Sequence, residues 1–264
     1  MNISKLPAFE ASFVTDKTDS EGKLFKLTSS TVSMPGDSSG PLNITVCEPA
    51  SGDNSFYYTT PPPDPSDATK KRIVLHFTEG YIKGDIAALT TPGNHVSVPF
   101  VIARDGSIYN LWASKYWSYH LGKGCVGGNS VISPSSIGIE LSNIGPLTLS
   151  GSSLLTGNGD TYCSLSDTDD YTALPAPYRG YSYYASFTEE QYKSLITLLR
   201  FLTTKYSIPR RFLDEPARYN LFATDALAKA STGIVSHVNF RAPGEKVDIG
   251  PAFDWKRVIA AVTA

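Results

Sequence analysis

Three things are scarce in this sequence: cysteine, long apolar runs and an excess of either charge. The 264 residues include only Cys47, Cys125 and Cys163, too few and too widely spaced for a disulfide framework. Lys and Arg number 23 against 25 Asp and Glu, a formal net charge of -2, so electrostatics gives no reason to expect nucleic acid or an anionic membrane as a partner. No apolar run approaches the roughly 20 residues of a spanning helix, so membrane insertion is not expected.

The composition changes near residue 66. Residues 1–66 are rich in Ser, Thr, Gly and Pro and close with a Pro-rich stretch that favours extended backbone. The first residues, MNISKLPAFEASF, lack the basic segment and the following apolar segment of a secretory signal peptide. We therefore expect an N-terminal arm and Pro-rich linker over residues 1–66, followed by one domain over residues 67–264.

The first half of this domain is rich in strand patterns. RIVLHF, which starts at Arg72, is a short apolar run typical of a buried strand, and VPFVIARDGSIYNLW predicts two strands around an Asp105-Gly106 turn. SSIGIELSN, residues 135–143, predicts a further strand. Residues from about 145 to 187 show no steady period, and we expect a long loop insertion there, with substrate contact as its function.

The helices come late in the chain. Thr188 and Gln191 form a capping-box pattern ahead of apolar residues at helical spacing, which predicts a helix that ends before Pro209. A less regular helix is expected over residues 219–230, and Asp254 is placed to cap a final one. Strands followed by helices, with few βαβ alternations, predict an α/β protein with a mixed central β-sheet covered by helices.

The four histidines are His76, His95, His120 and His237. His is the commonest protein metal ligand and the commonest general base. Taken singly, His76 at the end of its strand and His237 before a Pro- and Gly-rich loop are as well explained as buried core histidines. Together with Asp248 they form a His-His-carboxylate set that leaves a fourth position open, the arrangement of catalytic rather than structural zinc.

Five segments, in this order, resemble the zinc-dependent N-acetylmuramoyl-L-alanine amidases of the type 2 family, a group that includes the peptidoglycan recognition proteins. They are VLHFTEG (74–80), FVIARDGSIYNLW (100–112), WSYHLG (117–122), SIGIEL (136–141) and VSHVNFRAPGEKVDIGPAFDW (235–255). The resemblance covers the chain from about residue 70 to the C-terminus. It implies an amidase/peptidoglycan recognition protein-like fold with an N-terminal extension, a Zn2+ cofactor and bacterial peptidoglycan as the partner.

The resemblance also implies roles for individual residues. Glu140, in IGIEL, matches the acidic residue that activates water in the family. Lys246, in EKVDIG, matches the lysine that stabilises the tetrahedral oxyanion, and His120, in WSYHLG, matches a histidine that lines the substrate cleft. The family's three zinc ligands correspond to His76, His237 and Asp248.

Two departures concern the surroundings of this site. Relatives commonly read DPG where this chain reads DIG at residues 248–250, so the stiffening of the turn by proline is lost. Pro99 stands where many relatives have a histidine or tyrosine. Without the motifs, Glu140 would be interpreted as a surface carboxylate on an edge strand and Lys246 as a solvated loop lysine.

The sequence therefore predicts a peptidoglycan hydrolase that cleaves the amide bond between N-acetylmuramic acid and the L-alanine of the stem peptide. Two alternatives stay open: a non-catalytic peptidoglycan-binding module, and an unrelated metal-dependent amide hydrolase that the Tyr-rich insertion retargets. We expect the protein to be made in the cytoplasm without a signal peptide and to act at the cell wall or periplasm after non-classical delivery. The extra N-terminal arm favours a phage endolysin or a secreted antibacterial effector over a recycling enzyme, with the arm as the contact for delivery machinery.

Overall fold

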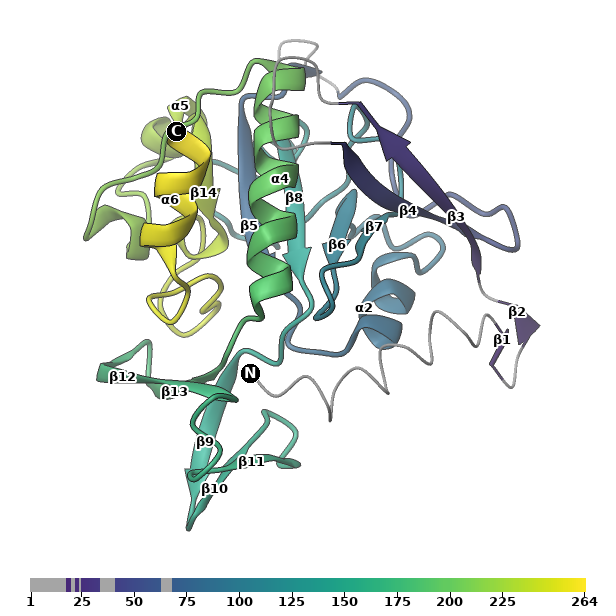
Figure 1. Cartoon of the computed structure of the whole chain (residues 1–264). Helices are drawn as coiled ribbons and strands as arrows, with labels where there is room; N and C mark the ends of the chain where they lie inside the picture. The colour runs from purple at the N-terminus through teal and green to yellow at the C-terminus, as the bar shows by residue number, and fades with distance from the viewer. Residues whose placement is uncertain (1–17, 20–21, 24, 34–40, 63–67) are drawn as a thin grey trace.

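The computed structural model describes residues 18–19, 22–23, 25–33, 41–62 and 68–264. Within these ranges the chain forms a seven-stranded sheet, a five-stranded sheet, a two-stranded ribbon and five α-helices (Figure 1). None of these helices is long and apolar enough to cross a bilayer. Residues 63–67, which fall in the predicted linker, lie outside the described residues. So do residues 1–17, for which the sequence predicts no signal peptide.

The seven-stranded sheet is mixed, as the sequence predicts. Its strands follow the order β14-β5-β8-β6-β7-β4-β3. Neighbours are parallel from β14 to β6 and between β7 and β4, and antiparallel at β6–β7 and β4–β3. The strands are β3 (Phe25–Val32), β4 (Leu42–Pro49), β5 (Arg72–Phe77), β6 (Phe100–Ile102), β7 (Ile108–Asn110), β8 (Ser136–Leu141) and β14 (Gly233–Ser236).

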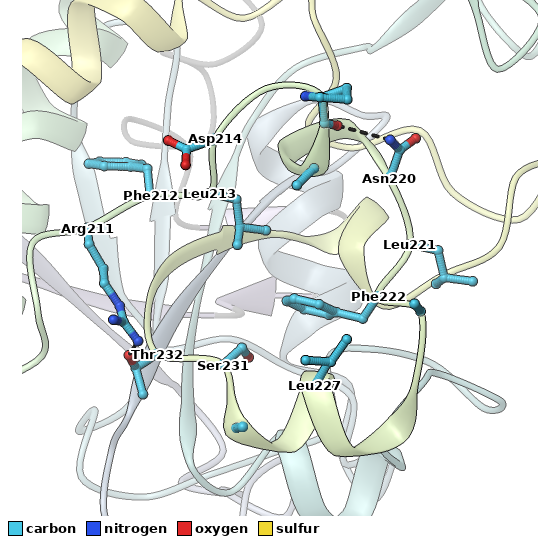
Figure 2. A pocket seen from close by; sticks show the side chains of 14 residues that line it. Arg211, Phe212, Leu213, Asp214, Asn220, Leu221, Phe222, Leu227, Ser231 and Thr232 are labelled. Carbon is cyan, nitrogen blue, oxygen red and sulfur yellow. Dashed lines mark hydrogen bonds between the residues drawn. The ribbon is translucent and has the colours of Figure 1, made fainter.

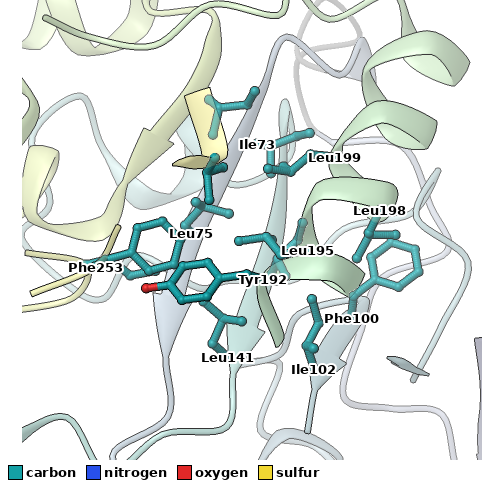
Figure 3. Packing of buried hydrophobic residues seen from close by; sticks show 14 of the residues in the cluster. Ile73, Leu75, Phe100, Ile102, Leu141, Tyr192, Leu195, Leu198, Leu199 and Phe253 are labelled. Atoms are coloured by element: carbon teal, nitrogen blue, oxygen red, sulfur yellow. The ribbon is translucent and has the colours of Figure 1, made fainter. Parts of the chain in front are cut away.

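Helices α4 (Glu189–Tyr206) and α6 (Trp255–Thr263) cover one face of this sheet (Figure 1). The predicted capping box starts α4: the Thr188 hydroxyl accepts from the Gln191 N–H, and the Gln191 side chain accepts from the Thr188 N–H. Asp254 caps α6: its carboxylate accepts from the N–H of Arg257. The two helices and the sheet share one apolar cluster, of which Figure 3 labels Ile73, Leu75, Phe100, Ile102, Leu141, Tyr192, Leu195, Leu198, Leu199 and Phe253.

Shorter helices pack on the opposite face. The helix α2 (Ile82–Leu89), which the sequence analysis missed, joins a cluster with residues of β6 and β7. The helices α3 (Asn129–Ile132) and α5 (Asp225–Ala230) flank a second cluster around β5 and β14. The helix expected over residues 219–230 is therefore too long: a 3-10 turn η2 (Ala217–Tyr219) ends first, and Thr224 then caps a new helix.

The N-terminal strands belong to the sheet. β4 pairs in parallel with β7, and β3 pairs along its whole length with β4. Phe25 and Leu42 are buried, which ties this hairpin to the apolar clusters. Residues 25–49 thus extend the sheet, although the sequence analysis places them in a separate arm; the boundary at residue 66 stays a prediction. A short ribbon, β1 (Thr18–Asp19) with β2 (Gly22–Lys23), precedes them.

The segment from 145 to 187 is a second sheet, so the prediction of a long loop is wrong. All of its strand pairs are antiparallel, and two of its hairpins close with two-residue turns, at 151–152 and 179–180. Most of its strand residues are exposed or half-buried, and such strands need not show the apolar alternation that identifies a strand in a sequence. In the order β11-β10-β9-β13-β12, the strands are β9 (Pro146–Ser150), β10 (Ser153–Leu155), β11 (Thr161–Ser164), β12 (Tyr171–Tyr178) and β13 (Tyr181–Ala185).

Candidate metal centre

His76 and Glu140 lie side by side on neighbouring parallel strands. The register of β5 and β8 pairs them directly. Side chains alternate between the two faces of a sheet, and Leu75 and Ile139, which precede them, belong to the apolar cluster under α4. His76 and Glu140 therefore face the opposite side of the sheet, near the carboxyl ends of their strands.

The loop that begins at His237 returns to its own start. His237 opens the short 3-10 turn η3 directly after β14, the strand beside β5. The N–H of Val238 donates to the carbonyl of Asp248 over 2.8 Å. The Ser236 hydroxyl donates to the Ile249 carbonyl and accepts from the Ile249 N–H, over 2.9 and 2.6 Å. These bonds place Asp248 against His237, although eleven residues separate them.

His76, His237 and Asp248 direct one ligand atom each at a common point. The two Nδ1 atoms lie 3.0 Å apart, and Oδ2 of Asp248 lies 2.9 Å from the Nδ1 of His237 and 3.4 Å from that of His76. Tetrahedral zinc with bonds of about 2.0–2.1 Å to nitrogen and oxygen separates its ligand atoms by roughly 3.3 Å. The spacing and the donor types of this cluster therefore fit zinc.

The second nitrogen of each imidazole also has a partner. Nε2 of His237 lies 3.3 Å from the carbonyl oxygen of Leu121, to which it donates. Nε2 of His76 lies 3.0 Å from Nδ1 of His120. A metal-binding histidine keeps its outer N–H on an acceptor, which fixes the tautomer and the ring orientation. With a metal bound, the two Nδ1 atoms would be its ligands, and Nδ1 of His120 would accept from the Nε2–H of His76. Its predicted contact with substrate stays a prediction.

Two carboxylate oxygens beside the histidines are buried without a hydrogen-bond partner in the described chain, Oδ1 of Asp248 and Oε2 of Glu140. Buried polar atoms in native proteins are paired as a rule, so these two atoms point to a group that the protein binds. A cation between the ligands offers such a partner to Asp248. A water molecule or a substrate N–H offers one to Glu140.

The protonation states suit a metal and a proton acceptor. Burial lowers the pKa of His76 to about 4, so its imidazole is neutral at pH 7, the form that binds metals. Burial acts to raise the pKa of Asp248, but His237 and His76 together outweigh it and hold that pKa below the ordinary range. Burial, together with the charge of Asp248, raises the pKa of Glu140 well above its usual value.

Lys246 lies half-buried, two residues before Asp248. Its positive charge opposes the rise that burial causes in the pKa of Glu140 and of Glu79. The ammonium group therefore lies within electrostatic reach of both carboxylates. His95, for which the sequence suggested no role, is not part of this cluster: its ring stacks on Tyr58, with centroids 4.0 Å apart.

A pocket of about 320 Å³ opens where the residues after β5 meet the second sheet. Glu79, three residues beyond His76, stands on its rim at a positive φ of 57°. The second sheet contributes Asp160, Asn158 and the hydroxyl-bearing Thr156 and Tyr181 to the lining. No sequence motif marks this pocket, because its two sides are brought together only by the fold.

A larger cavity of about 740 Å³ lies beside α5 and η2 (Figure 2). Its walls are mainly apolar, from Phe212, Leu213, Phe222 and Leu227, and Arg211 donates to the hydroxyl of Thr232 across its edge. None of the six predicted site residues is among those that line it. This cavity therefore lies apart from the His-His-Asp cluster.

A family model identifies the family of this chain. The family model for N-acetylmuramoyl-L-alanine amidase matches residues 66–251, a range that holds all six predicted site residues. Among solved structures, the chain is similar to a selenomethionine derivative of AmpD at 21% identity, covering 79% of this chain and 97% of that one, with a TM-score of 0.43.

Two further structures are similar. The Escherichia coli N-acetylmuramyl-L-alanine amidase AmiD, in complex with anhydro-N-acetylmuramic acid-L-Ala-D-gamma-Glu-L-Lys, is 21% identical, with 77% of this chain and 59% of AmiD covered and a TM-score of 0.45. The amidase LysC from Clostridium intestinale is 16% identical, with 78% and 95% covered and a TM-score of 0.40. No curated protein sequence matches this chain.

Proposed function

Because this chain belongs to the N-acetylmuramoyl-L-alanine amidase family, we propose that it hydrolyses the amide bond between N-acetylmuramic acid and L-alanine in bacterial peptidoglycan, with zinc as its cofactor. The observation that carries the proposal is the convergence of His76, His237 and Asp248 beside Glu140. The three side chains would hold the zinc ion. When bound, zinc supplies a Lewis acid that polarises the carbonyl and lowers the pKa of water.

Glu140 moves the proton in this proposal. Its carboxylate accepts the proton of the attacking water and then delivers it to the nitrogen of the departing L-alanine. The pairing of β5 with β8 fixes Glu140 next to His76, so the proton acceptor stands beside one of the residues that would hold zinc. A buried carboxyl group with a raised pKa holds a proton more readily than an exposed one, and this favours the second step.

Lys246 and His120 complete the site. The ammonium group of Lys246 stabilises the oxyanion that forms when the carbonyl is attacked, as a fixed charge in a half-buried site. His120 accepts from Nε2 of His76 and keeps that imidazole in the tautomer that presents Nδ1. The pocket beside Glu79 and Asp160 is the part of the surface we assign to the stem peptide.

We place the activity at intact cell wall. The hairpin of β3 and β4 extends the sheet and lies outside the segment that the family model matches. Such an addition to the amidase domain favours a lytic protein, either an endolysin or a delivered effector. Delivery machinery that contacts the N-terminal residues is part of the same proposal.

Digestion of purified sacculi tests the proposal. We expect zinc-loaded protein to release stem peptides that begin with a free L-alanine amine, detected by mass spectrometry, and a chelated sample to release none. The variant His237→Ala is the matched control, because it should lose both zinc and activity. Cleavage of a soluble muropeptide but not of sacculi would remove the lytic role. Sacculi that bind the protein and stay intact would replace the amidase with a recognition module.

A further inference from the structure

The tip of the β12–β13 hairpin holds a residue in an unfavourable conformation. Tyr178 pairs with Tyr181, so Arg179 and Gly180 form a two-residue turn, and both have positive φ, 49° and 95°. Turns of this kind favour Asn, Asp or Gly at both positions. An arginine there is strained, and backbone strain of this sort persists where surrounding contacts offset it.

The guanidinium of Arg179 makes those contacts. Nη1 donates to the carbonyls of Arg241 over 3.1 Å and Ala242 over 3.3 Å, and also to the carbonyl of Lys246. Nη2 donates to the carbonyl of Val238 over 3.1 Å. All four acceptors belong to the loop between His237 and Asp248. Nη1 has two hydrogens for three carbonyls, so one hydrogen is shared between two of them. The planar guanidinium spreads its donors over two such nitrogens and so reaches four carbonyls, whereas a single ammonium group has three donors on one nitrogen.

Tyr178, the residue before Arg179, contacts the chain just after Asp248. The ring of Tyr178 fills the space that a Cβ on Gly250 would take, with ring carbons only 2.6 and 2.7 Å from that position. Its hydroxyl donates to the carbonyl of Tyr219 over 2.9 Å. The hairpin tip therefore contacts the chain on both sides of Asp248, through Arg179 before it and Tyr178 after it.

We propose that Arg179 is a positioning residue of the metal centre, and that the second sheet serves to hold the loop that carries Asp248 and Lys246. The inference rests on the proposed zinc amidase function. The hydrogen bonds of the Arg179 guanidinium run to backbone carbonyls and not to the side chains of the three proposed ligands. Arg179 acts by fixing the backbone at residues 238 and 246, on which the geometry of Asp248 and the direction of Lys246 depend.

The turn itself supplies a sharp variant. Arg179→Gly removes the guanidinium and also relieves the strain at φ 49°, so the relief in the turn offsets part of the stability lost with the four hydrogen bonds. We expect the metal-free variant to stay folded, with a thermal midpoint no more than a few degrees below that of the parent. The dissociation constant for zinc, measured by competition with a chromogenic chelator, should rise by roughly 10–100-fold, as for other outer-shell partners of metal sites.

Three further measurements separate positioning from general stability. Guanidinium ion at low concentration should restore part of the zinc affinity of Arg179→Gly, because it can occupy the vacated carbonyl cage. The zinc affinity of Arg179→Lys should lie between that of the parent and that of Arg179→Gly. With zinc saturating, kcat of Arg179→Gly should fall more than KM rises, because Lys246 is displaced. The control Arg257→Met, which breaks the ion pair with Glu189 on the other face of the sheet, should leave zinc affinity unchanged.

The outcomes distinguish this inference from the proposed function. A parent protein that binds no zinc and releases no stem peptide would overturn the proposed function. A parent that does both, beside an Arg179→Gly variant with the same zinc dissociation constant and the same kcat, would overturn the role of Arg179 alone. A variant whose zinc affinity falls only in step with its thermal midpoint would show that Arg179 stabilises the fold and does not position the site.

Discussion

The side chains of β5 and β8 point alternately to the two faces of the sheet, and the two faces differ in character. Toward α4 and α6 the strands present Ile73, Leu75 and Ile139, all fully buried in one apolar cluster. Toward the other side they present His76 and Glu140 near their carboxyl ends. One face is satisfied by packing alone, and the other also holds polar groups, among which Oε2 of Glu140 has no partner in the described chain.

This difference separates the source of stability from the source of chemistry. Burial of apolar surface is the main favourable contribution to folding, and the α4 face supplies it. A buried polar atom without a partner costs roughly 1–3 kcal/mol, and the opposite face carries two such oxygens, on Asp248 and Glu140. The face that carries His76 and Glu140 therefore depends for its folding on the apolar packing of the face under α4 and α6.

The largest effect is expected from Glu140→Gln. The amide cannot accept the proton, so kcat on sacculi should fall by roughly 10²–10⁴-fold, while zinc content stays at that of the parent. The stability of the metal-free protein should hold or increase, because a buried carboxyl group with a raised pKa disfavours folding at neutral pH. Zinc analysis, kinetics and urea unfolding on the same preparation check this. Full activity would assign the proton transfer to another group.

The opposite outcome is expected on the packed face. Leu199→Ala in α4 removes a fully buried side chain from the apolar cluster and should lower the free energy of unfolding by roughly 2–5 kcal/mol. Below the unfolding transition, kcat and zinc affinity should stay within twofold of the parent. A large loss of kcat in the folded variant would mean that the two faces are coupled and that stability and chemistry are not separate.

A smaller effect is expected from acid on the metal-free protein. The pKa of His76 is 6.5 in a model compound and about 4 when folded, so between these values the unfolded chain binds a proton that the folded chain does not. Stability should therefore fall as the pH falls through this window, by up to about 3 kcal/mol. The raised pKa of Glu140 acts in the opposite direction over the same range. Urea unfolding of Glu140→Gln without zinc measures the combined contribution of His76 and His120, because burial lowers the pKa of both histidines. A flat profile would contradict it.

The parts of the fold that the sequence predicts are those with a local signal. RIVLHF and SIGIEL are apolar runs that become β5 and β8, and the Thr188 capping box marks the start of α4. The second sheet has no such signal, because its strands are short and mostly exposed and its pairing is set by turns. The pairing of β4 with β7 is equally hidden, since strand order depends on contacts distant in sequence.

The candidate site divides in the same way. Residue types and motifs singled out His76, His237 and Asp248 as a metal set, and the structure brings them together. The position of Glu140 follows from the register of two parallel strands, which no single segment encodes. The role of Arg179 could not be predicted from the sequence. An Arg-Gly pair indicates a turn, but the carbonyls that the guanidinium contacts lie about 60 residues away in the chain.

The proposed ligand set contains two nitrogens and one oxygen, and a metal centre of this composition would be insensitive to redox conditions. A thiolate ligand can be oxidised and lost, whereas imidazole and carboxylate persist in oxidising and reducing surroundings alike. The three cysteines are free and buried, and burial raises the pKa of Cys47 to about 12 and that of Cys125 to about 11. Those two thiols stay protonated and sheltered. Zinc held by His76, His237 and Asp248 would therefore respond to chelators and acid but not to peroxide or thiol reagents.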